Sequence, residues 1–433
     1  MTVEDPVARS PGDVLGLGER NHPLRAALSY EMHVRKLPRF ATPCRLLQVV
    51  TLLGEGGAPD TQAHIDALCR AAGLSLAAGS RFAMLPLGGG MDLVWERHTE
   101  VASYMFVLPG PFAQPFDPAA FVDARKVLDG VPGLVIRATQ IALLGRDAPD
   151  PSEALIAESF VVDGLVVSDV AGGRARLWSD FQLNADGFGR LLIADRGLSG
   201  DEPAQLVQRV QELGNYRNMA LLGLPLAQRL TPDVTALEQR LAKLTHGIAE
   251  HVSEDDRLLD ELTFLSAELA RLLAETRYRM NATRAYAQIV ADRLESLAGM
   301  RVAGFQTLDD FTERRLMPAV RTCESFSLRL EDLSRRASWA SALLRTRIDT
   351  ALARQNRDLL ASMDRRTRLQ LRLQQTVEGL SIVAISYYLV GLVGYVVKAA
   401  PSIPEKVAMG VATPIVLAGV AWYMSRLRRQ LKD

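Results

Sequence analysis

Residues 379–425 read GLSIVAISYYLVGLVGYVVKAAPSIPEKVAMGVATPIVLAGVAWYMS, and this stretch decides the fold. Two runs within it, residues 379–397 and 407–425, are each 19 residues long and carry no charged side chain. A helix rises about 1.5 Å per residue, so each run spans roughly 28 Å, close to the ~30 Å hydrocarbon core of a bilayer. The two runs predict a transmembrane hairpin. The alternative is a hairpin buried in a soluble core, but core helices are seldom apolar on every side over this length.

The residues around the two apolar runs predict their orientation. Basic side chains precede the first run and follow the second: Arg365, Arg366, Arg368, Arg372, Arg426, Arg428, Arg429 and Lys432. The link between the runs holds only Lys398 and Lys406, beside Glu405. Because basic residues remain on the cytoplasmic side of a membrane, we expect both chain ends in the cytoplasm and the link outside.

The amino-acid composition limits which classes of molecule the chain is expected to bind. The 50 Lys and Arg residues balance 50 Asp and Glu residues, which argues against a nucleic acid partner. The basic residues beside the apolar runs favour anionic lipid headgroups, so the lipid bilayer is the expected partner. Cys44, Cys69 and Cys323 are far apart, which fits a reducing compartment and forms neither a disulfide framework nor a zinc motif.

Four parts of the chain differ in pattern, and together they predict an α+β protein. Residues 1–20 lack the apolar run of a signal peptide and are expected to be a loose tail. Residues 21–200 are expected to form a layered α/β cytoplasmic domain, and residues 201–375 a helical domain with a long stalk helix. Residues 376–433 hold the hairpin and its basic cytoplasmic tail.

Short β-branched and apolar runs separated by turn residues predict the strands of the α/β domain. We expect strands at 46–53, 81–87, 92–97, 101–108, 134–144, 160–167, 175–183 and 188–194. Helices are expected at 60–72 and 117–128, and a hairpin turn at 184–187.

Apolar residues that recur every three or four positions predict helices in the second half of the chain. A helix is expected at 202–222, ended by Pro225, and another from Pro232 to about residue 298. Thr307 is a suitable N-cap for one helix over 308–397, which would be about 135 Å long and would enter the first membrane span. Its apolar residues recur mostly every three or four positions, as in a coiled coil. A helix of this length must pack on the preceding helices or on copies of itself, which predicts a homo-oligomer.

Four stretches place the sequence beside a known family: NHPLR at 21–25 with EMH at 31–33, WERHTE at 95–100, NYRNMALLGLP at 215–225, and QLRLQQTVEGLS at 370–381. In these stretches the chain resembles a bacterial family of uncharacterised membrane-anchored proteins, known only as a domain of unknown function. The resemblance covers nearly the whole chain. It implies membrane anchoring, and it implies no activity. From this anchoring, together with the two apolar runs and their basic flanks, we expect a multi-pass protein of the bacterial inner (cytoplasmic) membrane.

The overall arrangement also resembles the CorA-type metal-ion transporters. These have a cytoplasmic α/β domain, a long helix that enters the first of two C-terminal spans, and a homo-pentameric pore. Their Gly-Met-Asn triplet after the first span is missing here, where residues 394–398 read GYVVK. Since that triplet selects hydrated magnesium in the family, the resemblance does not extend to magnesium specificity.

A group of charged residues with alternating spacing is the candidate site of the α/β domain. Glu96, His98 and Glu100 would share one face of a strand, and Glu31 and His33 have the same spacing. Carboxylates and imidazoles can bind a divalent cation, whereas neighbouring arginines would make the same group an ion-pair cluster. We expect ion pairs, with a divalent cation as the alternative partner.

Motifs for catalysis or cofactor binding are missing. Neither a phosphate-binding loop nor a nucleophile elbow has its required spacing, and the residues around 182–193 lack the acidic ligands of a calcium loop. We therefore expect no enzyme and no cofactor.

A polar stripe marks the first membrane span. Glu378, Ser381, Tyr388 and Tyr395 follow one another at helical spacing, and Gly391 and Gly394 allow a neighbouring helix to approach closely. Such a stripe either lines a pore or packs against another helix. Two functions follow: a homo-oligomeric CorA-like ion channel or transporter with a cytoplasmic sensing domain, or a binding or scaffold protein that the hairpin only tethers to the membrane.

Overall fold

The computed structural model describes residues 22–25, 28–29, 38–54, 57–77, 79–250, 255–399 and 404–430. The chain divides into two compact units. The first unit consists of residues 1–246 and 262–338, and the second of residues 247–261 and 339–433. The expected tail at residues 1–20 lies outside the described residues.

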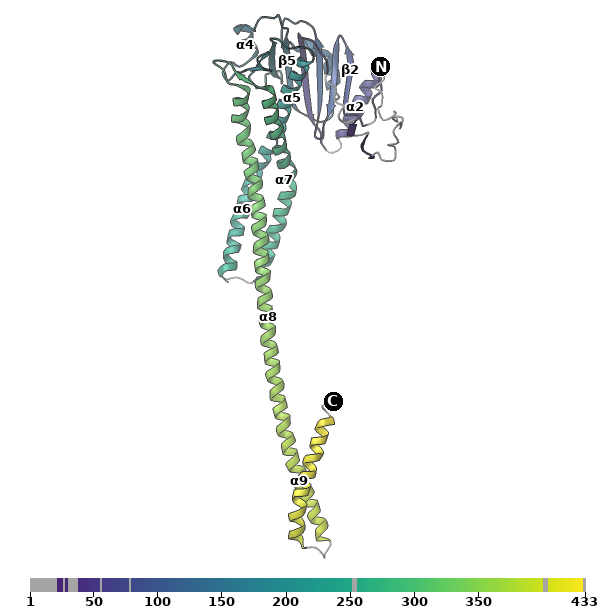
Figure 1. The fold of residues 1–433 in the computed structure, drawn as a ribbon, viewed down its shortest axis with the longest axis vertical. Coiled ribbons are helices and arrows are strands. Elements are labelled where there is room, and N and C mark those ends of the chain that lie inside the picture. Colours follow the sequence, from purple (N-terminus) through teal and green to yellow (C-terminus); the bar gives the residue numbers. More distant parts are fainter. Residues whose placement is uncertain are drawn as a thin grey trace. The chain divides into compact units, whose positions relative to one another are not determined.

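A nine-stranded mixed sheet forms the centre of the first unit (Figure 1). Its strand order is β2-β3-β4-β1-β5-β8-β7-β6-β9, and β5 and β8 are its parallel neighbours. The strands are β1 (Cys44–Leu52), β2 (Phe82–Gly88), β3 (Met91–Arg97), β4 (Val101–Pro109), β5 (Leu134–Leu144), β6 (Val166–Val170), β7 (Ala175–Ser179), β8 (Gly189–Asp195) and β9 (Met300–Arg301). The mixed α and β architecture expected from the sequence is confirmed.

Helices cover both faces of the sheet, because successive strand residues point to opposite sides. Leu47, Trp95 and Phe106 pack in one apolar cluster with α2 (Gly57–Ala71) and α3 (Val122–Leu128). On the other face, Leu46, Val94 and Val107 pack in a second cluster with three helices. These are α5 (Glu202–Leu221), α7 (Asp255–Leu297) and α8 (Leu308–Lys398).

One expected strand is wrong. Residues 160–167 follow a short helix, α4 (Glu153–Ser159), and the strand β6 begins only at Val166. Ser152 starts α4, since its Oγ accepts a hydrogen bond from the amide of Leu155 at 3.2 Å. A turn that contains Gly164, at φ +97°, then separates α4 from β6. Phe160 and Leu165 are buried without strand pairing, whereas Val161 and Val162 are exposed.

The boundary between the first two long helices also differs from expectation. Helix α6 (Gly223–Glu250) begins two residues before Pro225, so this proline lies in its first turn, and it continues through Pro232. A proline is tolerated in the first turn because that amide has no partner within the helix. At Pro232 the neighbouring Leu230 and Val234 are buried, and this packing keeps the helix continuous.

Helices α6, α7 and α8 pack side by side within the first unit (Figure 1). Arg329 of α8 donates to both carboxylate oxygens of Glu238 on α6, at 3.1 and 2.8 Å. The start of α8 is confirmed: Thr307 Oγ1 accepts from the amide of Asp310 at 3.0 Å, as an N-cap does.

The second unit contains the C-terminal part of α8 and the helix α9 (Glu405–Gln430). Arg347 of α8 pairs with Asp255 at 3.0 Å and donates to the carbonyl oxygen of Ile248 at 2.8 Å. Beyond it, α8 continues as one helix to Lys398, which confirms the single long helix expected from the sequence. Both α8 and α9 contain a stretch long and apolar enough to cross a membrane.

Candidate ligand-binding site

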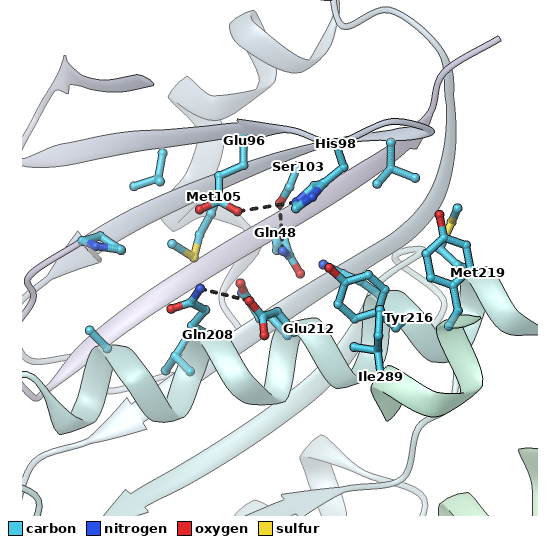
Figure 2. Close-up of a pocket in the computed structure, with 18 of the residues that line it drawn as sticks. Gln48, Glu96, His98, Ser103, Met105, Gln208, Glu212, Tyr216, Met219 and Ile289 are labelled. Carbon is cyan, nitrogen blue, oxygen red and sulfur yellow. Dashed lines mark hydrogen bonds and ion pairs between the residues drawn. The ribbon is translucent and has the colours of Figure 1, made fainter. Parts of the chain in front are cut away.

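A cavity of about 370 Å³ lies between the sheet and two helices of the first unit (Figure 2). Strands β1, β3 and β4 form one wall, α5 forms the opposite wall, and α7 contributes Tyr286 and Ile289. Its polar lining comes from Gln48, Glu96, His98, Thr99, Ser103, Gln208, Gln211, Glu212, Asn215, Tyr216 and Tyr286. This volume lies in the range of small-molecule pockets, roughly 300–1,000 Å³.

Strand alternation brings Glu96 and His98 to this cavity. Val94 faces α5, whereas Leu93 and Trp95 face the opposite side of the sheet. Because side chains alternate along a strand, Glu96 lies on the same side as Val94, and His98 lines the cavity just after the end of β3. His98 Nε2 lies 3.7 Å from Glu96 Oε2. The two side chains thus form an ion pair at the wall of the cavity whenever the imidazole is protonated.

Glu100 has a different surrounding, because β3 ends at Arg97 and Glu100 lies in the turn before β4. Its buried carboxylate accepts two hydrogen bonds from Arg279, at 2.8 and 3.2 Å, and one from Tyr286 Oη at 2.9 Å. Burial alone would raise the pKa of Glu100, but the hydrogen bonds from Tyr278, Tyr286 and Arg279 lower it overall. Glu100 therefore ties the β3–β4 turn to α7 as a carboxylate.

Among the described residues, no group of three or more His, Cys, Asp and Glu side chains is arranged to hold a metal ion. Glu31 and His33 lie outside the described residues. In the part of the group that is described, the contacts of Glu96, His98 and Glu100 are those of ion pairs.

Two tyrosines form the aromatic part of the cavity wall. The rings of Tyr216 and Tyr286 are stacked, with centroids 5.6 Å apart and an interplanar angle of 22°. Beside them, Glu212 accepts from Gln208 at 3.0 Å and from Arg293 at 2.5 Å. The lining contains two carboxylates, Glu96 and Glu212, and no Lys or Arg among the described residues. A ligand of this cavity meets an aromatic surface and two carboxylates, of which Glu212 is paired with Arg293 and Glu96 lies beside His98.

A hydrogen-bond chain runs from this cavity along the side of the sheet that faces α5. Gln48 Nε2 donates to Ser103 Oγ at 2.8 Å, and Gln48 Oε1 accepts from Arg137 Nη1 at 2.5 Å. Arg137 Nη1 also donates to Asn215 Oδ1 at 3.0 Å. Gln48 therefore makes a hydrogen bond at each end of its amide, and it helps to position Arg137.

Several of these residues carry little local signal in the sequence. Gln48 and Arg137 lie inside strands that are otherwise largely apolar, and a polar residue in such a run is the one local signal they carry. Asn215, Tyr216 and Met219 belong to the stretch at 215–225 that carries the family resemblance, and they line the cavity. Tyr286 has no local signal, because its role depends on how α7 packs.

The polar stripe of α8 lies in the second unit. Tyr388 and Tyr395 are exposed, whereas Glu378 and Ser381 are partly buried, and Ser381 Oγ donates to the carbonyl of Val377 at 2.8 Å. Gly394 lies against Met409 of α9, where an added Cβ would be 3.4 Å from Sδ. Gly391 faces open space.

The described basic residues that flank the apolar runs lie on α8 and α9. Arg365, Arg366, Arg368 and Arg372 are exposed on α8, and Arg368 pairs with Asp364 at 2.7 Å. Arg426 lies over the ring of Trp422 at 5.3 Å. Arg428 and Arg429 fall within α9, and Lys432 lies outside the described residues.

Comparison with protein families matches residues 20–431 to one family, described as "Protein of unknown function (DUF3422)". A search of curated proteins gave no match. The family match agrees with the resemblance to an uncharacterised family that the sequence stretches carry. It gives no support to the resemblance to CorA-type transporters.

Proposed function

The chain belongs to the DUF3422 family, and we propose that it is a membrane-anchored binding protein whose sheet domain takes a small ligand at the cytoplasmic side. In this proposal α9 and the end of α8 cross the bacterial inner membrane as a hairpin. The binding function belongs to the cavity between the sheet and α5.

The exposure of apolar side chains on α8 and α9 carries the membrane part of the proposal. Leu380, Leu392 and Val396 of α8 and Ile415 and Trp422 of α9 are exposed. Water would surround these side chains in a soluble protein, at a cost of about 25 cal/mol per Å² of apolar surface. A bilayer removes that cost, and the basic flanks at both ends favour cytoplasmic termini.

Paired arginine substitutions test the membrane insertion. Leu389→Arg with Leu392→Arg places two charges near the middle of the first apolar run, and each costs about 2.5–3.5 kcal/mol there. We expect this variant to leave the membrane fraction on alkaline carbonate extraction. Leu360→Arg with Met363→Arg is the matched control, because both residues are exposed on the same helix before the apolar run. If both variants fractionate alike, the hairpin does not anchor the chain.

The acidic lining of the cavity favours a ligand with a positive charge. Tyr216 and Tyr286 add an aromatic surface, which attracts organic cations. Tetramethylammonium chloride is a suitable probe, compared with sodium chloride at equal ionic strength. We expect it to raise the melting temperature of the full chain in detergent, and Glu96→Gln to reduce that effect. Glu158→Gln, an exposed position outside the cavity, should respond as the wild type does. Equal responses to both salts would contradict a cation site.

A second candidate function is a homo-oligomeric ion channel, and one observation favours self-association. Leu359, Leu369 and Leu373 continue the apolar stripe of α8 and are exposed. A single helix of this length is unstable without a partner, and a second copy offers the same stripe. In such a bundle the polar stripe from Glu378 to Tyr395 would surround the axis, and Glu378 would form a ring of carboxylates that attracts cations.

Cysteine cross-linking tests the assembly. Leu373→Cys should form cross-linked oligomers, whereas Leu371→Cys should not, because the two positions lie about 200° apart around the helix. The native residues Cys44, Cys69 and Cys323 are buried, so they do not interfere. If the assembly conducts ions, Glu378→Gln should reduce the cation flux. A protein that stays monomeric in native lipid would exclude the channel.

A further inference from the structure

A second cavity of the first unit, of about 360 Å³, lies on the other side of the same segment of α5. Whereas Asn215, Tyr216 and Met219 line the first cavity, Gly214, Arg217 and Asn218 line the second. Strand β5 and the start of β8 complete its wall. Its lining includes Arg137, Arg190 and Arg217, and no Asp or Glu among the described residues. The guanidinium of Arg190 itself lies against Phe116 and Ser159 on the opposite face of the sheet. The two cavities therefore differ in the sign of their charge.

The three arginines differ in how their charge is compensated. Arg190 pairs with Asp186 at 3.2 Å. Among the described residues, neither Arg137 nor Arg217 has a carboxylate within ion-pair distance. Arg137 donates only from Nη1, to the neutral oxygens of Gln48 and Asn215. Nε and Nη2 of Arg137 and the whole guanidinium of Arg217 remain as donors for a ligand.

Packing contacts with Gly214 and Phe181 hold the two guanidinium groups in place. Arg137 packs against Gly214, where an added Cβ would be 2.6 Å from Nη2, so a side chain at this helix position would displace the guanidinium. The guanidinium of Arg217 lies 4.7 Å from the ring centre of Phe181. Phe181 has φ +52°, an unusual conformation for a residue other than glycine, and its ring stacks on Phe311 at 4.6 Å. Two cations are thus positioned before any ligand is bound.

The environment of this pair disfavours positive charge. Burial, and then the charge of Arg217, lower the pKa of Arg137. Burial also lowers the pKa of Arg217. A partly buried charge without a partner is costly, and a bound anion would remove that cost.

We propose that this second cavity binds the phosphate group of a small molecule, held between Arg137 and Arg217. Guanidinium groups present paired N–H donors that match the oxygens of phosphate, and Asn218, Thr139 and Gln182 supply further polar groups in the same cavity. This site shares no lining residue with the acidic cavity, although Gln48 and Asn215 of that cavity accept hydrogen bonds from Arg137, and it does not depend on whether the chain is membrane-anchored. Failure of either proposal therefore leaves the other untouched.

The rim of the cavity indicates the rest of the ligand. Val135 and Leu183 line the cavity and are largely exposed, and Leu134 beside them is exposed as well. Apolar side chains next to an arginine pair suit a phosphate that carries an apolar substituent. Each CH₂ group that such a substituent buries should tighten binding about fourfold.

Thermal melting and calorimetry of the full chain in detergent test the site with inorganic phosphate. Potassium chloride at equal ionic strength is the reference. At ten times its dissociation constant, phosphate should raise the melting temperature by roughly 3–6 °C over the chloride reference. No difference between the two salts would overturn the proposal.

Substitutions on α5 test whether phosphate binds in this cavity. Arg217→Gln should weaken phosphate binding at least tenfold, since hydrogen bonds to charged groups contribute about 1.5–3 kcal/mol. Arg217→Lys keeps the charge but loses the planar pair of donors, so its affinity should lie between those of the wild type and Arg217→Gln. Arg209→Gln is the matched control, because Arg209 is an exposed arginine of the same helix and does not line the cavity. Equal losses in Arg209→Gln and Arg217→Gln would overturn the proposal.

Two further measurements separate binding from stability and test the apolar rim. Without phosphate, Arg217→Gln should melt within about 2 °C of the wild type, because it loses the Phe181 contact but also an uncompensated charge. A variant that melts much lower would assign Arg217 a structural role instead. Hexyl phosphate should bind several-fold more tightly than inorganic phosphate, and Leu183→Ser should reduce that gain. Equal affinities for the two phosphates would overturn the apolar part of the ligand.

Discussion

The two ends of α8 carry the same apolar pattern and have opposite surroundings. Leu330 and Leu333, near its start, are 1% exposed, whereas Leu369 and Leu373, in its second half, are 65% and 70% exposed. Polar contacts follow the same division. Arg329 reaches Glu238 of another helix, but Arg368 reaches only Asp364, four residues earlier on α8 itself. A periodic stripe therefore specifies a face that needs a partner, but it does not specify which partner.

Truncating one apolar side chain in each half of α8 should give the largest difference in the free energy of unfolding. Leu330→Ala removes a buried side chain and leaves a cavity, so it should lower the free energy of unfolding by about 2–4 kcal/mol. Leu369→Ala should change it by less than about 0.5 kcal/mol, because the side chain is exposed. Urea unfolding of the full chain, followed by tryptophan fluorescence, measures both. A large loss for Leu369→Ala that grows with protein concentration would mean that a second copy covers this half.

Removal of one arginine in each half should give a smaller difference. Arg329→Gln breaks a half-buried, two-point contact with Glu238, which we expect to cost about 1 kcal/mol. Arg368→Gln breaks an exposed pair within one helix, which contributes about 0.3–0.5 kcal/mol at most. The same unfolding experiment measures both variants. Equal costs would show that the contact between α6 and α8 does not stabilise the first unit.

The contribution of the Arg329 contact should also depend on pH, and this effect is the smallest of the three. The hydrogen bond from Arg329 lowers the pKa of Glu238 in the folded state below its usual value of about 4.3. The stabilisation is therefore complete above the unfolded-state pKa and is lost as the pH falls through the folded-state pKa. The gap in unfolding free energy between wild type and Arg329→Gln should shrink below about pH 4.5. A gap that stays constant down to pH 3 would contradict this assignment.

Local signals predicted much of the fold. The strands β1 to β5, the cap at Thr307 and the continuous helix from Leu308 were all foreseen, because alternation, caps and apolar periods act over a few residues. The stretch at 160–167 was not, since its apolar residues fit a strand, whereas Val161 and Val162 lie exposed in a loop and only Val166 and Val167 pair. The position of β9 at the sheet edge was also not foreseen, because its two residues, Met300 and Arg301, pair with β6 across more than 100 positions.

The candidate site was predicted only in part. Glu96 and His98 were identified from their alternation, but Gln48, Glu212 and Tyr286 were not. Each of these three lies on a different element, and none of them belongs to a motif. The arginine pair was missed for the same reason: Arg137 is one charged residue in a strand and Arg217 is one in an amphipathic helix.

The sequence by itself determined the features that depend on neighbours along the chain: two uncharged runs of bilayer length, their basic flanks, and one unbroken helix that leads into them. Only the tertiary structure decided which half of α8 is buried and which side chains meet in each cavity. The physical reason is the same in both cases. Burial and charge compensation depend on groups that approach from distant parts of the chain, such as Arg137 of β5 and Arg217 of α5, and periodicity describes one element at a time.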